Sequence, residues 1–196
     1  IKNIVGKFIG LGGRIIEDKD YLAKYINSPE TLFFKKGSNL FNLDNARKLL
    51  NKTNSIYLVE GYMDVIGLVK NNVENVVANL GTSLTDKQIS ILTQYFDHVI
   101  ICFDSDTSGK NAALRAAENS VKELQPNKKI SFLFLPEKED PDTFINKKGK
   151  TEFLKFSQEN IVSIYDFIFN NYKQKVDNNP TSLAVFEKNL RNSANS

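Results

Sequence analysis

The sequence predicts an α/β fold in which a parallel sheet is flanked by helices. Four short runs rich in β-branched and aromatic residues are the expected strands: residues 55–59, 75–79, 98–103 and 130–135. The segments between them carry apolar residues at helical spacing: residues 62–70, 85–95 and 111–124. In the second of these segments Ile89, Leu92, Tyr95 and Phe96 share one helical face. Alternation of this kind indicates parallel strands joined by crossover helices.

The residues on either side of this block differ from it in character. Residues 1–52 are basic and punctuated by glycine, and we assign them to the C-terminal part of a basic mixed α/β subdomain. Residues 53–145 are predicted to form the sheet domain. Residues 146–196 are rich in Lys, Asn and Phe and are expected to form a helical lobe, with its helices at these positions: 151–156, 161–175 and from Thr181 onward.

Composition and charge exclude several classes of protein. The chain has 196 residues, of which 41% are hydrophobic and 25% charged, and no apolar run approaches the roughly 18–20 residues that span a bilayer. A membrane protein is therefore not expected. The net charge of +3 is compatible with a polyanionic partner but is too small to require one. Because the chain starts at Ile1 rather than Met, we expect a piece of a longer protein.

Cysteine and histidine usage narrows the chemistry further. Cys102 is the only cysteine, so no internal disulfide can form, and it is expected to be a buried strand residue rather than a nucleophile. His98 is the only histidine, which argues against zinc chemistry based on histidine ligands. These features favour a cytoplasmic protein.

Carboxylates follow three of the four predicted strands. Glu60 comes directly after the first strand, Asp104 and Asp106 follow the third, and Asp140 and Asp142 lie just beyond the fourth. The carboxyl ends of parallel strands gather at one rim of a sheet, where ligands bind. Clustered carboxylates repel one another unless a divalent cation neutralises them, and Mg²⁺ prefers hard oxygen ligands. We therefore predict a magnesium site at this rim.

Neighbouring residues bear on the same prediction. One residue separates Asp104 from Asp106, so their carboxylates can face the same side of an extended segment. A single D-x-D pattern is more often a turn or a helix cap, and it is the agreement of three strand ends that carries the inference. Asp64, one helical turn after Glu60, either supports this site or caps the helix. The polar loop at 79–83 suits either the approach of a phosphate or the capping of the next helix.

Several motifs resemble those of a known family. Three of them are similar to Toprim motifs: VEGYMDV at 59–65, NLGTSLT at 79–85 and FDSDTSGKNAA at 103–113. Three others are similar to segments of bacterial primases: KYINSPET at 24–31, FFKKGSNLF at 33–41 and LPEKEDPDTFI at 135–145. Over about residues 4–170 the chain thus resembles the catalytic core of replicative primases of the DnaG type, with a Toprim-type sheet.

This resemblance implies a metal-dependent enzyme that makes RNA primers on single-stranded DNA. It implies catalytic, metal-binding roles for three acids: Glu60, Asp104 and Asp106. Further metal contacts are expected from a second group: Asp64, Asp140 and Asp142. The implied cofactor is Mg²⁺, with Mn²⁺ as a substitute. Residues that would bind the nucleotide are Arg14, Lys24, Tyr25, Asn27 and Lys36, with Tyr25 packing on it. Weaker candidates for binding DNA are Arg47, Lys48 and Lys110.

The family resemblance also implies partners. These are ribonucleoside triphosphates, a single-stranded DNA template, and a replicative helicase that docks on a C-terminal domain outside this chain. Zinc is expected only in an N-terminal domain that is also outside it. We expect a monomeric core that acts in the nucleoid, at the replication fork, with no contact to a membrane.

Three alternatives stay open at this stage. Toprim motifs also occur in nucleases and recombination proteins, which would cut DNA rather than polymerise ribonucleotides. The FDSDTSG segment resembles the nucleophile loop of haloacid-dehalogenase phosphatases, but that loop follows the first strand, whereas here an earlier strand already ends in Glu60. A non-catalytic DNA-binding module is the third alternative, and the intact acids argue against it.

Overall fold

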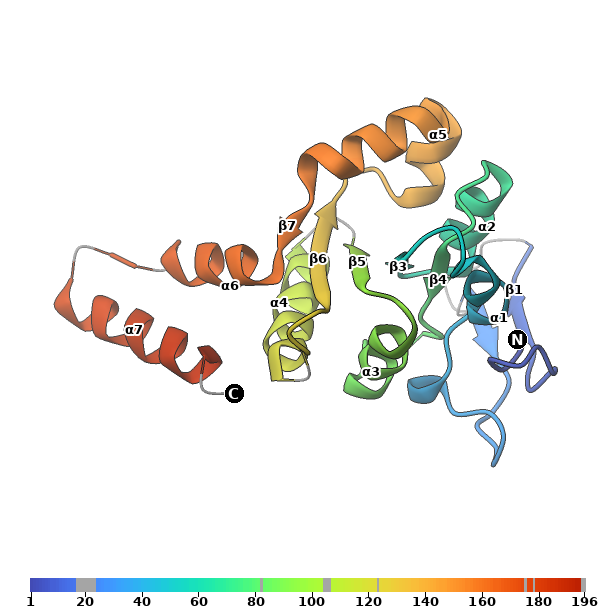
Figure 1. Ribbon diagram of the computed structural model, residues 1–196, viewed down its shortest axis with the longest axis horizontal. Helices are drawn as coiled ribbons and strands as arrows, with labels where there is room; N and C mark the ends of the chain where they lie inside the picture. The colour runs from blue at the N-terminus through green and yellow to red at the C-terminus, as the bar shows by residue number, and fades with distance from the viewer. Residues whose placement is uncertain are drawn as a thin grey trace.

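The chain folds around a five-stranded sheet with helices on both faces (Figure 1). The structure, a computed structural model, describes residues 1–16, 24–81, 83–103, 107–122, 124–174, 176–177 and 179–194. The strands are β3 (Ser55–Val59), β4 (Val76–Ala78), β5 (His98–Phe103), β6 (Lys129–Phe134) and β7 (Val162–Ser163). Their spatial order is β4-β3-β5-β6-β7. The first four strands run parallel and β7 is antiparallel to β6, which confirms the predicted α/β fold with a mostly parallel sheet.

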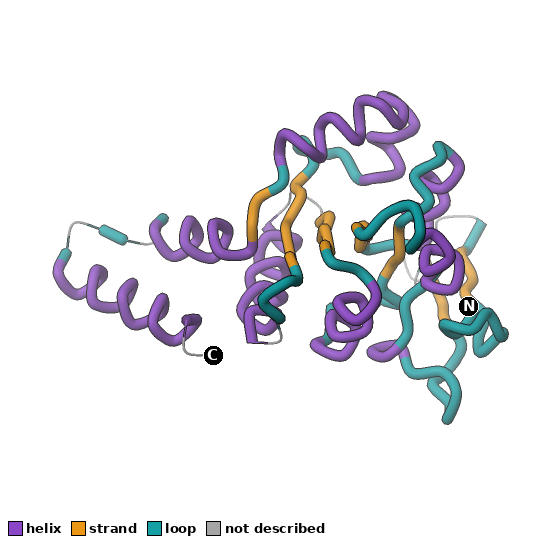
Figure 2. Tube along the Cα trace, in the orientation of Figure 1, coloured by secondary structure: helices purple, strands orange, loops and turns teal. Residues whose placement is uncertain are grey.

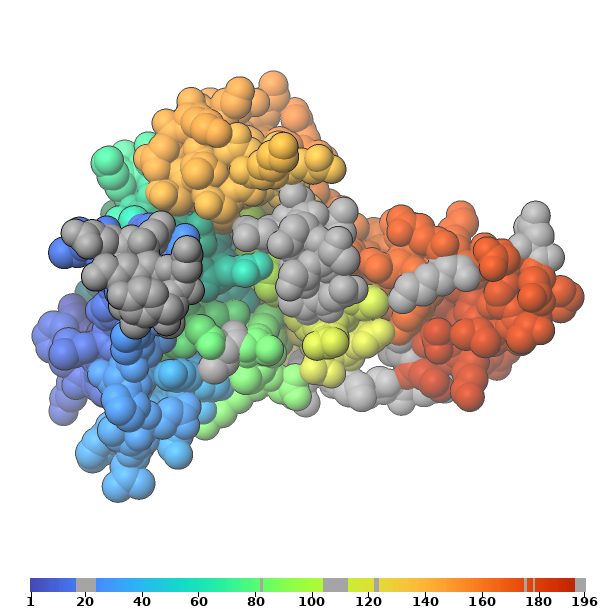
Figure 3. Space-filling view, turned by 180° about the vertical axis from the view of Figure 1, so that it is seen from behind, coloured from blue at the N-terminus to red at the C-terminus, as the bar shows by residue number. Residues whose placement is uncertain are grey.

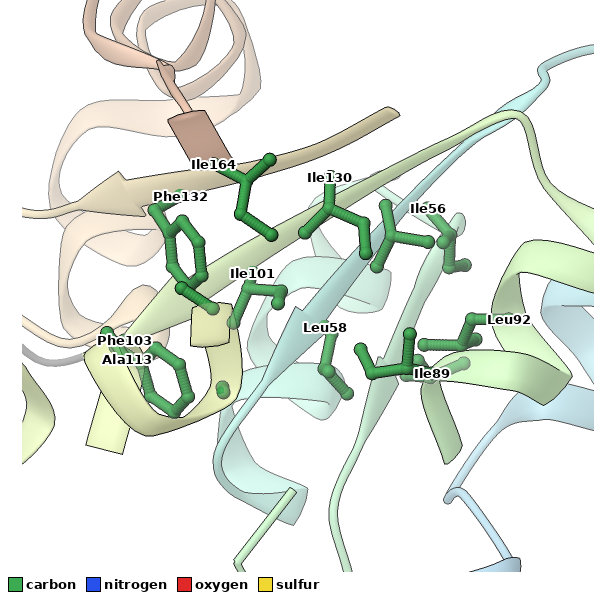
Figure 4. Packing of buried hydrophobic residues seen from close by; sticks show 14 of the residues in the cluster. Ile56, Leu58, Ile89, Leu92, Ile101, Phe103, Ala113, Ile130, Phe132 and Ile164 are labelled. Atoms are coloured by element: carbon green, nitrogen blue, oxygen red, sulfur yellow. The ribbon is translucent and has the colours of Figure 1, made fainter. Parts of the chain in front are cut away.

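One face of the sheet is covered by three helices: α3 (Asp86–Tyr95), α4 (Thr107–Lys122) and α6 (Ile164–Lys173). Alternate strand residues point toward them, including Leu58, Ile101 and Phe132. Figure 4 shows Leu58 beside Ile89 of α3, with Leu92 of the same helix beyond it, and Phe132 on the other side of Ile101. All five side chains are at most 2% exposed. Burial of this apolar surface is the main stabilising contribution on this face.

The opposite face is covered by α2 (Tyr62–Lys70) and α5 (Pro141–Asn160). Tyr57 of β3 packs there against Phe153 of α5, with ring centroids 5.4 Å apart. Cys102 is buried in β5 on the same face, which confirms that it is a strand residue. Helices α2 and α5 also pack against each other, as the ribbon and the Cα tube both show (Figure 2).

The basic N-terminal segment lies against the β4 edge of this sheet. It contains an antiparallel pair of strands, β1 (Gly12–Arg14) and β2 (Tyr25–Asn27), and three short helices: η1 (Lys36–Ser38), α1 (Leu43–Ala46) and η2 (Arg47–Leu49). The backbone N–H of Phe41 donates to the carbonyl of Ala78 at 2.9 Å, and this bridge ties the segment to β4. The segment is therefore held beside the carboxyl end of β4.

The C-terminal part differs from the sequence-based expectation in two places. Helix α5 starts at Pro141 and not near residue 151, because Asp140 caps its N-terminus and proline suits the first helical turn. The predicted helix at 161–175 begins only at Ile164, since Val162 and Ser163 pair with β6 as a short strand. The last helix, α7 (Pro180–Ala194), packs on α6 through Phe169 and Phe186 and extends to one side of the molecule (Figure 3).

The predicted division at 1–52, 53–145 and 146–196 stays a prediction. Its second boundary falls inside α5, which runs continuously across it apart from a kink at Gly149. Within the part of the chain that the structure describes, no helix combines the length and apolar character needed to cross a membrane.

Candidate functional site

A pocket of about 300 Å³ lies at the carboxyl edge of the sheet, beside β3 and β4. Both the basic segment and the sheet domain contribute to its walls. The lining residues are Tyr25, Asn27, Glu60, Gly61, Tyr62, Met63, Asp64, Asn79, Gly81 and Asp140. A cavity therefore lies at the rim where the cation site is predicted, and three of the six predicted acids line it.

Two of these acids belong to the junction between β3 and α2. Glu60 directly follows β3, and its side chain is exposed to solvent. Asp64 lies in the first turn of α2 and is 9% exposed. One of its oxygens, Oδ2, accepts a hydrogen bond from the backbone N–H of Gly61 at 2.9 Å. Asp64 therefore caps the helix, as one of the two sequence-based alternatives had it, and it also lines the pocket, while its role as a metal contact stays a prediction.

The two acids beyond β6 have different surroundings. Asp140 lines the pocket and caps α5, where its Oδ1 accepts from the backbone N–H of Thr143 at 2.6 Å. Asp142 is not among the lining residues. Its Oδ1 accepts from the Asn146 side chain at 2.7 Å, and the residue lies against Gly67 of α2. The structure therefore brings Asp140 to the pocket and directs Asp142 to the contact between α2 and α5.

Asp104 and Asp106 lie outside the described residues. Strand β5, which ends at Phe103 directly before them in the chain, is hydrogen-bonded in parallel to β3. Glu60 and the chain leaving β5 thus follow neighbouring strands at the same edge of the sheet.

Asn27 and Tyr62 join the basic segment to the sheet at this pocket. The Asn27 Nδ2 donates to the carbonyl of Leu80 at 2.9 Å, while its Oδ1 accepts from the Tyr62 hydroxyl. Burial raises the pKa of that hydroxyl, so it remains a protonated donor at neutral pH. Tyr25 forms a further wall, with the Arg14 guanidinium 5.5 Å from the centre of its ring. These contacts position the β2 strand over the acids.

The predicted lysines of the basic segment stand outside the pocket lining. Lys24 precedes β2 and is exposed. Lys36 belongs to η1, which is fixed by its backbone: the Lys36 carbonyl accepts from the Gln88 side chain at 3.1 Å. Lys36 is half-buried, whereas Lys24 is exposed.

Two of the three weaker DNA-binding candidates, Arg47 and Lys48, lie on η2, and the third, Lys110, lies on α4. The Arg47 guanidinium sits 5.6 Å from the centre of the Tyr95 ring. Lys48 donates from Nζ to the Asn45 side chain at 2.9 Å. Lys110 belongs to α4, and its side chain lies outside the described part of the structure.

The donor set of the pocket fits a hard divalent cation. Its lining residues include three with side-chain carboxylates and two with side-chain amides, and oxygens of these kinds are the ligands that Mg²⁺ prefers. In addition, the buried Oδ1 of Asn79 has no hydrogen-bond partner among the described residues. Among the described residues, no three His, Cys, Asp or Glu side chains are arranged to bind a metal ion. Asp104 and Asp106 are not among the described residues. Sequence reasoning did not anticipate Tyr62 at this pocket, and it considered Asn79 only as the first residue of the polar loop at 79–83.

Two family descriptions match this chain. Residues 57–145 match a family described as Toprim-like, and residues 1–47 match the N-terminal domain of the DNA primase catalytic core. The chain is 40% identical over 172 residues to the DNA primase of Legionella pneumophila, covering 88% of this chain and 30% of that protein. It is 38% identical over 177 residues to the DNA primase of Escherichia coli K12, covering 90% and 30%. The chain thus spans about 30% of the length of these relatives.

Solved structures give the same picture. The Escherichia coli primase catalytic core superposes with a TM-score of 0.90 at 36% identity, over 96% of this chain and 59% of that one. A structure described as the DnaG primase catalytic domain bound to single-stranded DNA gives a TM-score of 0.89 at 36% identity, over 96% and 60%. The fold is therefore similar to that of primase catalytic cores.

Proposed function

The chain belongs to the bacterial DnaG-type DNA primases, and on this premise we propose that it carries out the ribonucleotidyl transfer of RNA primer synthesis. The observation that carries the proposal is the pocket itself, because residues from the basic segment and acids from the sheet line the same cavity. A polymerising site needs polar and cationic groups for a triphosphate, and acids for divalent cations. Tyr25 and Asn27 of the basic segment line the cavity, and the Arg14 guanidinium lies against the Tyr25 ring.

The acids would hold the cations. We assign Glu60, Asp104 and Asp106 as the main ligands of Mg²⁺, for which Mn²⁺ substitutes, and Asp64 and Asp140 as outer contacts. When bound there, the cation lowers the pKa of the primer 3′-hydroxyl and stabilises the departing pyrophosphate. Asp142 has the weakest case for such a contact, since its carboxylate bonds to Asn146 beside Gly67.

The basic segment would bind the incoming ribonucleotide. Arg14, Lys24 and Lys36 supply positive charge for the triphosphate, and Tyr25 packs on the nucleotide. Asn27 acts at the same place, but both ends of its amide already bond within the protein, which favours a positioning role. The roles of these residues are to bind and orient the triphosphate over the acids.

The template and the remaining partners are proposed on the same basis. Single-stranded DNA would run between the basic segment and the rim of the sheet, with Arg47, Lys48 and Lys110 as phosphate contacts whose effect weakens as salt rises. A relative whose structure is described as bound to single-stranded DNA supports this assignment. The helicase contact and the zinc site would belong to domains outside this chain, and the protein would act in the nucleoid at the replication fork.

A Toprim nuclease or recombination protein is the second candidate, because the acids of the pocket would serve DNA cleavage equally well. The phosphatase interpretation is weaker, since β5, which Asp104 follows, comes after two earlier strands of the same sheet.

One assay distinguishes primer synthesis from DNA cleavage. The purified chain is incubated with single-stranded DNA, labelled ribonucleotides and Mg²⁺ or Mn²⁺, alongside Asp104→Ala. RNA oligomers that disappear in the variant support primer synthesis, whereas DNA nicking without RNA would favour the nuclease.

A further inference from the structure

Asn79 carries a buried polar group that none of the described residues pairs. Its side chain is only 7% exposed, and within the described part of the chain its Oδ1 has no hydrogen-bond partner. A buried acceptor without a partner costs on the order of 1–3 kcal/mol, so such groups usually serve a ligand when they line a cavity. Asn79 lines the rim pocket. A group that enters the pocket and satisfies this oxygen would remove the cost.

Strand register sets Asn79 beside Glu60. Val59 of β3 is paired with Ala78 of β4, and the next residues along the two strands are Glu60 and Asn79. The backbone N–H of Asn79 also donates to the carbonyl of Val59 at 3.4 Å, so the pairing continues to this position. Residues in register on parallel strands project from the same face of a sheet. Glu60 and Asn79 therefore leave the sheet as neighbours on one side.

The negative charge of the pocket favours a cation over an anion as the group that would contact Asn79. Three carboxylates line the cavity, and they would repel an anionic group placed among them. Two of them already accept backbone hydrogen bonds, Asp64 from Gly61 and Asp140 from Thr143. The Asn79 amide oxygen is uncommitted, and it adds a hard donor without adding negative charge.

We propose that Asn79 is an additional cation-binding residue of this site, which contacts a divalent cation through Oδ1 directly or through one of its water molecules. The inference rests on the proposed function, since it concerns the same rim pocket. It assigns a neutral amide oxygen at the end of β4 to a site otherwise built from carboxylates.

Cation binding can be measured without nucleotide or DNA. We would follow the free Mn²⁺ signal by electron paramagnetic resonance in titrations of the full chain. Asn79→Ala removes the oxygen, Asn79→Asp retains it, and Glu60→Gln tests the site as a whole. Asn75→Ala is the matched control, because Asn75 lies just before the same strand at its other end and bonds to the carbonyl of Ser55.

We expect Asn79→Ala to weaken Mn²⁺ binding about tenfold, as loss of supporting ligands commonly does, while Asn79→Asp and Asn75→Ala bind at least as tightly as the wild type. Without cation, Asn79→Ala should unfold at the same or higher denaturant concentration than the wild type, since it deletes an unpaired buried oxygen. A residue with a merely structural role would give the opposite shift.

Two results would overturn the inference in distinguishable ways. If Glu60→Gln weakens Mn²⁺ binding but Asn79→Ala does not, Asn79 is no cation-binding residue while the proposed site stands. A change confined to the KM for ribonucleotides would then assign its oxygen to a nucleotide hydroxyl. If neither variant alters binding, the cation site itself is misplaced, and the proposed function fails with it.

Discussion

The Tyr62 hydroxyl donates a hydrogen bond to the side-chain oxygen of Asn27, and this contact joins the basic segment to the sheet at the wall of the pocket. The surroundings leave little room for change. A Cβ on Gly12 would lie 3.2 Å from Asn27 Oδ1 and 3.3 Å from the Tyr62 hydroxyl. The Phe41 ring also packs edge-on against Tyr62, at 4.8 Å between centroids. The contact therefore fixes β2 relative to the acids that follow β3.

Tyr62→Phe tests the importance of that contact. The variant keeps the ring but deletes the donor, so the free energy of unfolding should fall by about 1 kcal/mol. The KM for ribonucleotides should rise severalfold with a smaller change in kcat, because β2 carries residues proposed to bind the nucleotide. Denaturant melts and initial-rate kinetics measure both effects. Tyr165→Phe, at an exposed tyrosine on α6, is the control and should change neither value.

Gln88 provides a second link between the two parts of the chain. Its side chain is fully buried, and Nε2 donates to the carbonyls of Lys36 at 3.1 Å and Asn39 at 3.0 Å. Gln88→Leu removes both of these hydrogen bonds, while the Lys36 carbonyl keeps only its 3.4 Å bond from the backbone N–H of Asn39, so we expect the free energy of unfolding to fall by about 2 kcal/mol in denaturant melts. Gln94→Ala, at an exposed glutamine on the same helix, should have little effect. Equal stability of the two variants would contradict this role.

Gly67 permits the close approach of α2 and α5. A Cβ at this position would lie 3.1 Å from both the Cα and the Cγ of Asp142. Alanine favours a helix over glycine by about 1 kcal/mol, but overpacking of a close contact costs about 1–3 kcal/mol, so Gly67→Ala should destabilise the fold. Thermal unfolding would show a lower Tm. Gly13→Ala, where a Cβ would meet nothing within 4 Å, should leave the Tm nearly unchanged.

His98 should make stability depend on pH. Burial lowers its pKa below 6.5, with nearby Lys129 adding to the effect, and its Nε2 lies 2.9 Å from the Ser131 hydroxyl. Between the folded pKa and 6.5 the unfolded chain binds more protons than the folded one, so stability falls as the pH drops through this window. Denaturant melts at pH 5 and pH 7.5 should show a smaller loss for His98→Gln than for the wild type. An equal loss in both proteins would count against this origin.

The regular part of the fold follows from short-range pattern. Strands β3 and β5 and helix α2 have the predicted bounds, because period-two and helical spacing are local signals. The prediction placed the start of α5 near residue 151 instead of at Pro141. Asp140 was considered only as a metal ligand and not as the residue that caps this helix. Strand β7 is two residues long and depends on pairing with β6, which leaves almost no trace in the sequence.

The site could be predicted only in part, because some of its contacts join residues on different elements that are far apart in the sequence. The convergence of Glu60 and Asp140 follows from parallel topology, which strand ends reveal. The bond between Asn27 and Tyr62 joins residues 35 positions apart, and no spacing rule links them. The diversion of Asp142 toward α2 likewise depends on how closely two helices approach at Gly67. The sequence therefore predicts most of the helices and strands, but it does not predict the side-chain contacts between them.

The most direct test of the account is primer synthesis by the wild type and by Glu60→Gln, on single-stranded DNA with labelled ribonucleotides and Mg²⁺. Glu159→Gln, at an exposed acid on α5, serves as the control. The account predicts RNA oligomers from the wild type and the control, and a loss of at least about a hundredfold in Glu60→Gln, as for removal of a group that stabilises transition-state charge. Undiminished RNA synthesis by a folded Glu60→Gln would contradict the assignment of this pocket as the catalytic site.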